Sequence, residues 1–156
     1  PVCGRCDVMK MAGEIIAAAV GTVAFSLIFG VPRRYYPYCG LIGAAGWFAY
    51  ALLYDSGVCT ATEATFLATV LVVLLSRFFA VREKCPVTVF LISGIFPLVP
   101  GAGIYWTAYY LVTDRVDLAL GVGFDAVKAA VAIVLAIVTV FELPYRFFRL
   151  AKRREP

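Results

Sequence analysis

The stretch IFPLVPGAGIY, residues 95–105, places two prolines and two glycines inside an apolar segment long enough to cross a membrane. Pro97 and Pro100 each lack a backbone N–H group and clash with the carbonyl group four residues earlier, which kinks or breaks an α-helix. Each proline also disfavours helical backbone angles at the residue before it, Phe96 or Val99. The stretch therefore predicts that a membrane-crossing helix is disturbed at its middle.

Two glycines follow the second proline, Gly101 and Gly103, and they permit close approaches that a side chain would block. Two prolines followed by Gly-Ala-Gly favour an interruption, with half-helices over about 86–95 and 101–113. Irregular backbone at this depth is tolerated only where it is buried in protein or lines a watery cavity. The start of the second half-helix would present free N–H groups and suit a carboxylate. A kink packed against a neighbouring helix is the alternative interpretation.

The composition of the whole chain is that of a membrane protein. Its 156 residues are 63% hydrophobic and 15% charged, with a mean hydropathy of +0.91. Soluble domains are roughly 45–50% apolar and about 25% charged. We therefore expect an all-α integral membrane protein that forms a single transmembrane domain over residues 1–156, with no cleavable signal peptide. The basic residues are dispersed, so we expect no nucleic-acid partner.

Five apolar segments approach the roughly 20 residues that a helix needs to cross a bilayer. We expect spans over about residues 13–30, 38–54, 62–81, 86–113 and 118–143, with the fourth broken at Pro97–Gly103 and a basic cytoplasmic tail at 145–156. The first span should stop at the sequence Gly30-Val31-Pro32.

Basic residues are distributed unevenly between the loops. Ten of them lie in the first loop, in the third loop with Arg77 at the end of the third span, and in the tail, whereas three lie on the opposite side. Lysine and arginine collect on the cytoplasmic side of membranes. The sequence therefore predicts five spans with the N-terminus outside and the C-terminus inside.

The fifth predicted span carries two charges within its body, Asp125 and Lys128. They are three residues apart and therefore neighbours on one face of a helix. Ionisable residues inside membranes are rare, tend to pair and face the protein interior or a cavity. We expect either a role in substrate or proton handling or a mutually neutralised pair. Glu14 and Glu142 lie near span ends, where we expect them to be interfacial.

Other chemical motifs are weak. Cys3 and Cys6 form a lone CxxC pair, and the chain has no histidine to complete a zinc site. The sequence contains no motif of a hydrolase, metalloprotease or phosphate-binding loop. We expect a protein that is not an enzyme and that needs no cofactor or metal. Tyr105, on the second half-helix, would either line a cavity or join an aromatic belt.

The segment VFLISGIFPLVPGAGIYWTAYYLV, residues 89–112, resembles the signature of the threonine/serine exporter family, in particular its C-terminal membrane half. That half also occurs as the small subunit of two-component exporters linked to succinate. VPRRYYPYCGLIGAAGW, residues 31–47, and ATFLATVLVVLLSR, residues 64–77, resemble further parts of the same half, so that the likeness covers most of the chain.

The resemblance implies a component of a secondary exporter in the cytoplasmic membrane, acting with a larger five-span subunit. An odd number of spans would give the two halves inverted topology, which places a binding site between them. Threonine, serine and a succinate-type dicarboxylate remain open as substrates. The predicted substrate-binding residues are Pro97, Pro100, Gly101, Ala102, Gly103, Tyr105, Asp125 and Lys128. The alternatives are a non-transporting assembly partner and a passive channel subunit, and a homo-oligomer is left open.

Overall fold

The computed structural model describes the backbone of residues 4–57 and 59–143, with side chains from Met9 onward. The described residues form helices and turns without a strand, as predicted. The predicted tail at 145–156 and the side chains of Cys3 and Cys6 lie outside the described residues. The helices are α1 (Gly4–Ile28), α2 (Tyr36–Asp55), α3 (Ala61–Glu83), α4 (Val87–Ile95), α5 (Gly101–Val112) and α6 (Val116–Phe141), with short 3-10 turns η1 (Arg33–Tyr35) and η2 (Phe96–Leu98).

Local sequence explains where the helices begin and end. α1 stops before Gly30, whose φ of 66° requires the left-handed conformation that glycine adopts without strain. This confirms the predicted stop. α3 begins with a capping box: the Glu63 amide donates to Thr60 Oγ1 at 3.4 Å, and the Thr60 amide donates to Glu63 Oε2 at 2.8 Å. α3 ends at Glu83, and the C-cap residue Lys84 that follows has a φ of 54°.

Three helical segments are long and apolar enough to cross a membrane, namely Met9–Ile28, α3 and α6, and the bent pair α4–η2 and α5 would make a fourth. α2, which corresponds to the second predicted span over residues 38–54, has 20 residues. It is absent from this set because its tyrosines and glycines lower its hydropathy. The structure therefore supports a membrane protein with three to four candidate spans.

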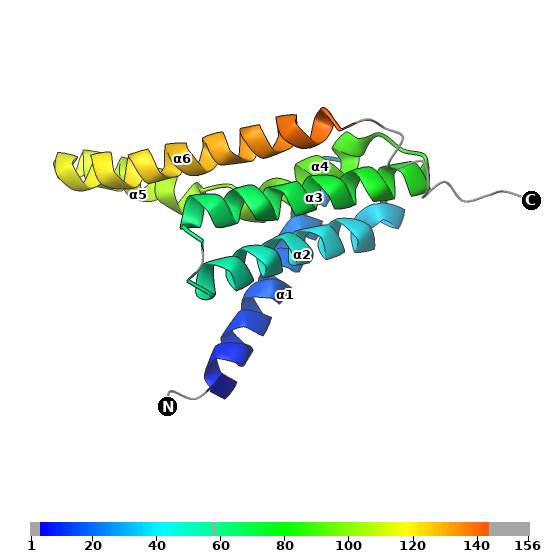
Figure 1. The fold of residues 1–156 in the computed structure, drawn as a ribbon, viewed down its shortest axis with the longest axis horizontal. Coiled ribbons are helices and arrows are strands. Elements are labelled where there is room, and N and C mark those ends of the chain that lie inside the picture. The colour runs from blue at the N-terminus through cyan, green and yellow to red at the C-terminus, as the bar shows by residue number, and fades with distance from the viewer. Residues whose placement is uncertain (1–3, 58, 144–156) are drawn as a thin grey trace, which may run out of the picture.

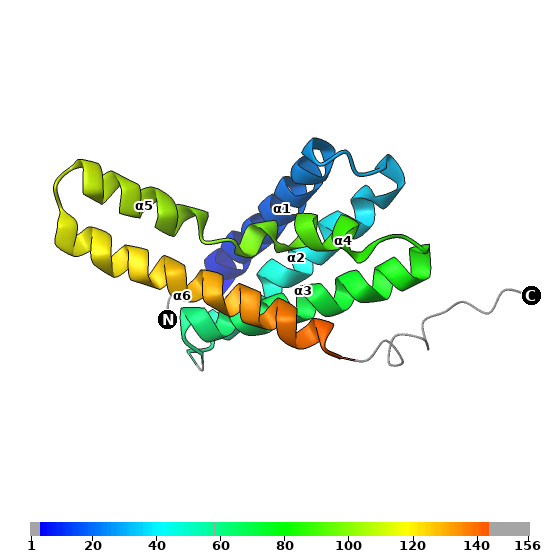
Figure 2. The same cartoon turned by 90° about the horizontal axis from the view of Figure 1, so that it is seen from above.

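α2, α3 and α4 pack into a body, and the C-terminal half of α6 lies along α3, while α5 and the N-terminal half of α6 project together as a hairpin (Figures 1 and 2). The N-terminal part of α1 also extends away from this body. Small residues bring the helices close together, as is usual in membranes. A Cβ atom added to Gly94 would lie 2.6 Å from Ile42 Cγ2, and one added to Gly46 would lie 2.5 Å from Val72 Cγ2. The α2–α3–α4 body is therefore tightly fitted and can support a site at its edge.

Arg77 joins α3 to the end of α6. Its guanidinium donates to the carbonyl groups of Val140 and Leu143, the latter at 3.2 Å, and lies 5.4 Å from the centre of the Phe141 ring. The side chain is buried. The positive-inside count treated Arg77 as a charge at the end of a span, whereas in the fold its charge is engaged by carbonyl groups at the C-terminal end of α6, where a cation is favoured.

Candidate functional site

The fourth predicted span is interrupted where the prolines lie. α4 passes into the 3-10 turn η2, after which Val99 is extended (φ −63°, ψ 130°) and Pro100 also leaves helical angles (φ −74°, ψ 53°). α5 then starts at Gly101, bent by 51° from the preceding half. The predicted interruption is confirmed, and the half-helices end within a residue of the expected bounds.

The expectation for Phe96 is wrong, because its backbone is helical (φ −50°, ψ −44°). Pro97 occupies one of the first positions of the 3-10 turn, where a missing N–H group leaves no acceptor unsatisfied. The Phe96 ring also stacks on Phe25 of α1. Unwinding is therefore confined to Val99 and Pro100.

The break leaves main-chain donors available at the start of α5. The Gly101 amide turns back to the Val99 carbonyl at 2.7 Å. The next two amides, those of Ala102 and Gly103, donate to no backbone carbonyl among residues 4–57 and 59–143. Free amides at a helix N-terminus carry positive dipole character and favour anions. The start of α5 therefore has the electrostatics that a carboxylate requires.

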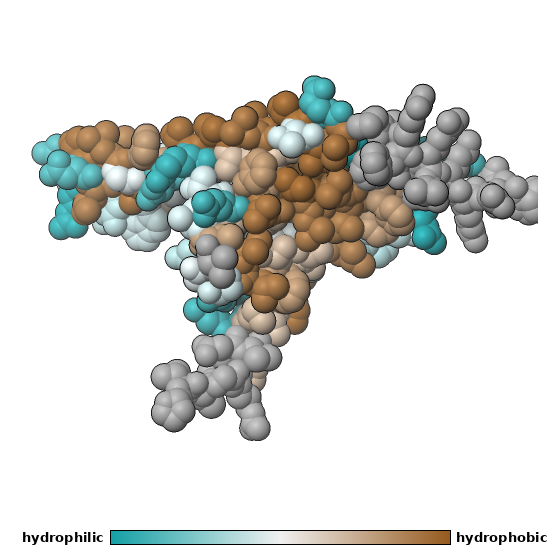
Figure 3. Space-filling model, in the orientation of Figure 1, coloured by the Kyte–Doolittle hydropathy of each residue, from teal (hydrophilic) through white to brown (hydrophobic). Residues whose placement is uncertain are grey.

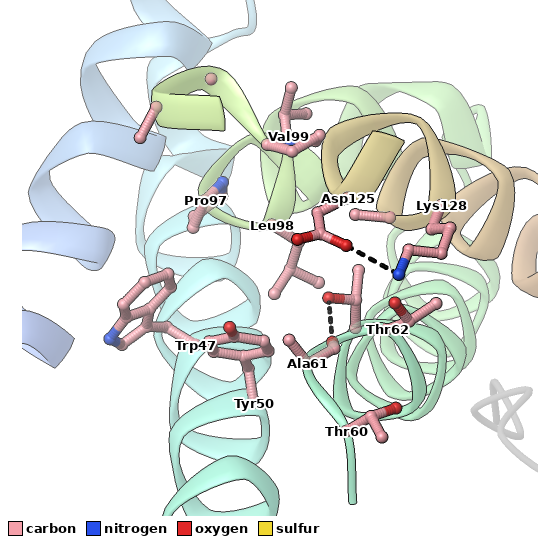
Figure 4. A pocket seen from close by; sticks show the side chains of 15 residues that line it. Trp47, Tyr50, Thr60, Ala61, Thr62, Pro97, Leu98, Val99, Asp125 and Lys128 are labelled. Carbon is pink, nitrogen blue, oxygen red and sulfur yellow. Dashed lines mark hydrogen bonds and ion pairs between the residues drawn. The ribbon is translucent and has the colours of Figure 1, made fainter. Parts of the chain in front are cut away.

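A cavity of about 570 Å³ lies against this break. Figure 4 shows side chains from several elements around it, with Asp125 and Lys128 of α6 opposite Trp47 and Tyr50 of α2. The N-terminal end of α3 provides a further wall. The complete lining consists of Trp47, Tyr50, Thr60, Ala61, Thr62, Thr65, Pro97, Leu98, Val99, Pro100, Gly101, Ala102, Asp125, Lys128 and Ala129.

The predicted charge pair is formed at this cavity. Lys128 Nζ lies 2.7 Å from Asp125 Oδ1, and their side chains are 46% and 73% exposed, respectively. Lys128 also lies 5.2 Å from the centre of the Phe124 ring. The carboxylate of Asp125 points between the break and the start of α3 (Figure 4). Because neither charge is buried in the bundle, both can reach a solute in the cavity.

A second helix N-terminus faces the same space. Thr60, Ala61 and Thr62 begin α3 and line the cavity. The capping box satisfies the Glu63 amide, but the amides of Ala61 and Thr62 donate to no backbone carbonyl in the described part of the chain. Two positive helix ends and one ammonium group therefore converge on one cavity, with a single carboxylate among them.

Six of the eight predicted site residues line the cavity: Pro97, Pro100, Gly101, Ala102, Asp125 and Lys128. Gly103 instead packs against α6, because a Cβ atom there would lie 3.1 Å from Ala126 Cβ. Tyr105 is 61% exposed and does not line the cavity; its ring lies 5.5 Å from that of Trp106. Gly103 thus contributes a free amide and close packing, and Tyr105 belongs to an aromatic surface.

Sequence reasoning missed two walls of the site. Trp47 and Tyr50 carry no local pattern that distinguishes them from interfacial aromatics. The start of α3 did carry a signal, since Thr60-Ala-Thr-Glu63 has the spacing of a capping box and so marks a helix N-terminus. Only the fold shows that this terminus faces the break.

These features define a helical membrane protein with a solute-sized cavity at a broken helix. The family model described as Threonine/Serine exporter, ThrE, matches residues 14–141, which is most of the chain. The chain belongs to this family of exporters, and the resemblance to the threonine/serine exporter family is confirmed. No solved structure gives a significant match.

Proposed function

We propose that the chain is the small subunit of a heteromeric secondary exporter, which moves a small carboxylate-bearing metabolite out across the cytoplasmic membrane. The family supports exporter-type transport. The observation that carries the proposal is the meeting of two helix N-termini with the Lys128–Asp125 pair in one cavity. Such discontinuous helices hold substrates near the midplane of secondary transporters.

The cavity suits a zwitterionic solute. Its carboxylate would accept hydrogen bonds from the amides of Ala102 and Gly103 and interact with the ammonium of Lys128, while its own ammonium would replace Lys128 beside Asp125. A hydroxy amino acid meets both requirements. A C4-dicarboxylate would place a second negative charge near Asp125, where like charges repel. We therefore favour threonine or serine over succinate.

The proposed complex includes a larger five-span subunit. α5 has no buried residue in the isolated chain, and α6 presents large exposed apolar side chains along most of its length (Figure 3). An exposed ion pair on such a helix would be expensive facing lipid. A second half of inverted topology would cover the open side of the cavity. We place the N-terminus of this chain outside and its C-terminus inside, as the distribution of basic residues predicts.

Gly101→Leu tests the site directly. A Cβ atom at Gly101 meets no atom within 4 Å, and Gly101 lines the cavity, so the leucine would occupy space at the start of α5. The measurement is threonine export from preloaded cells that lack other exporters and express both subunits. We expect export to fall to background, while the amount of protein in the membrane stays unchanged.

Gly121→Leu is the matched control, because Gly121 also has open space, lies in α6 and does not line the cavity at the break. It should export as the wild type does. Normal export by Gly101→Leu would overturn the proposed site. Uphill export that persists after addition of an uncoupler would overturn coupling to an ion gradient.

A further inference from the structure

Trp47 lines three cavities of the structure. Its indole lines the main cavity at the break, and it also lines a cavity of about 270 Å³ with Glu14 and Pro97. A third cavity of about 580 Å³ is bordered by Trp47, Glu14 and Asp55. One side chain therefore forms part of the walls of all three cavities.

Glu14 holds that indole. Trp47 Nε1–H of α2 donates to Glu14 Oε2 of α1 at 3.4 Å. The indole N–H is a donor only, so its orientation depends on an acceptor. Glu14 is half-buried and lies within Met9–Ile28, one of the segments able to cross a membrane. The hydrogen bond therefore joins a half-buried carboxylate of α1 to an aromatic side chain of α2.

We propose that Glu14 is a proton-binding site that positions Trp47. In the ionised state the carboxylate accepts a charge-assisted hydrogen bond and keeps the indole in the wall between the cavities. When one proton binds to a carboxylate oxygen, the hydrogen bond weakens and Trp47 is released. Loss of the proton restores the first state. Glu14 thus acts through Trp47, and the proposal, which rests on the proposed exporter function, makes the wall of the main cavity sensitive to pH.

Several charged or titratable groups surround Glu14. A pH-dependent change in Trp47 emission must therefore be distinguished from protonation of these groups. Lys10 precedes Glu14 by one turn of α1, and Tyr50, Tyr54 and Asp55 of α2 line the same cavity. On the side of the break, Phe96 and Pro97 are uncharged. The Asp125–Lys128 pair faces Trp47 across the main cavity without bordering either of the cavities that Glu14 lines.

Tryptophan fluorescence measures the proposed step without any transport. The chain has two tryptophans, so Trp106→Phe leaves Trp47 as the sole reporter. The full-length protein in phospholipid nanodiscs is titrated from about pH 8 to about pH 4. We expect one sigmoidal change in Trp47 emission. Glu14→Gln should abolish it, whereas Glu14→Asp should retain it with a displaced midpoint.

Asp55→Asn is the matched control, because Asp55 lines the same cavity and no hydrogen bond joins it to Trp47 in the described part of the chain. It should leave the transition in place. In cells with both subunits, export by Glu14→Gln should lose its dependence on external pH, and Glu14→Asp should recover it.

A flat emission curve for the Trp106→Phe protein, or a transition that survives Glu14→Gln, would overturn the proton site. If the emission curve is flat while Gly101→Leu still abolishes export, the proposed exporter function stands. If the change in Trp47 emission depends on Glu14 while Gly101→Leu exports normally, the proposed binding site at the break is wrong and the proton site at Glu14 is supported.

Discussion

The ammonium of Lys128 lies 2.7 Å from the Asp125 carboxylate, one helical turn away on α6, and the pair faces the break in the neighbouring span. Two exposed charges that neutralise each other can remain in an apolar helix and still separate when a zwitterion arrives. The ion pair therefore gives the cavity one group for the carboxylate of a substrate and one for its ammonium. The contribution of Lys128 and that of Asp125 to binding can be tested separately.

Lys128→Gln should lower the apparent affinity for threonine by about tenfold or more, because a hydrogen bond to a charged group contributes roughly 1.5–3 kcal/mol. Asp125→Asn should weaken binding of the ammonium group by a similar factor. The concentration dependence of export measures both effects. The double exchange Asp125→Lys with Lys128→Asp keeps a pair, so it should be made in normal amounts but misplace both charges. Wild-type affinity in the double variant would contradict these roles.

Pro100→Ala should reduce export more than Pro97→Ala. Val99, which precedes Pro100, is extended, whereas Phe96 before Pro97 is helical, so only the second proline enforces a non-helical residue. Alanine at position 100 allows the helix to continue through the break. The amides of Ala102 and Gly103 would then donate to carbonyl groups of the same helix and would no longer be free to bind a carboxylate. Initial export rates, normalised to protein in the membrane, compare the two variants. Equal loss in both would show that the prolines act through packing.

Gly43→Ala should destabilise the fold by about 1–3 kcal/mol, since overpacking of a tight contact forces shifts of side chains and backbone. The new Cβ atom would lie 2.0 Å from Thr22 Oγ1, which is itself buried and donates to the Ala18 carbonyl. Gly101→Ala has open space and should change stability by less than about 0.5 kcal/mol. Unfolding in detergent measures the difference. The opposite ranking would contradict the packing of α1 on α2.

Arg77→Met should lower the free energy of unfolding by about 2 kcal/mol or more, because it removes a charged donor from the carbonyl groups of Val140 and Leu143. Arg77→Lys should recover part of the loss. The exposed Arg82, in the last turn of the same helix, provides the control, and Arg82→Gln should stay within about 0.5 kcal/mol of the wild type. Denaturant titration of the three variants and the wild type measures these differences in the free energy of unfolding.

Native cysteines test the proposed orientation. Cys59 lies between α2 and α3, and Cys85 lies between α3 and α4, so an N-terminus outside places Cys59 outside and Cys85 inside. In a variant whose other cysteines are replaced, a membrane-impermeant maleimide should label Cys59 in intact cells. It should label Cys85 only after the cells are permeabilised. Burial raises the pKa of the Cys85 thiol, so its labelling should speed up as the pH rises. The reversed pattern would reverse the topology.

The break itself could be predicted from the sequence, since proline and glycine act on the backbone of their own neighbourhood. The half-helix bounds and the Asp125–Lys128 contact followed from spacing alone, because an i, i+3 pair on a helix meets whatever surrounds it. Phe96 was predicted wrongly because a 3-10 turn tolerates Pro97, and a local rule does not distinguish this turn from an α-helix.

The apolar composition, the helical class and the membership of the exporter family were determined by the sequence by itself. The tertiary structure alone decided which surfaces face the break. It placed the start of α3, residues 60–62, and Trp47 around the cavity that Asp125 lines, and it packed Gly103 against Ala126. The reason is physical. Backbone breaks and neighbouring charges on one helix are short-range effects, whereas the lining of a cavity depends on how helices distant in sequence pack.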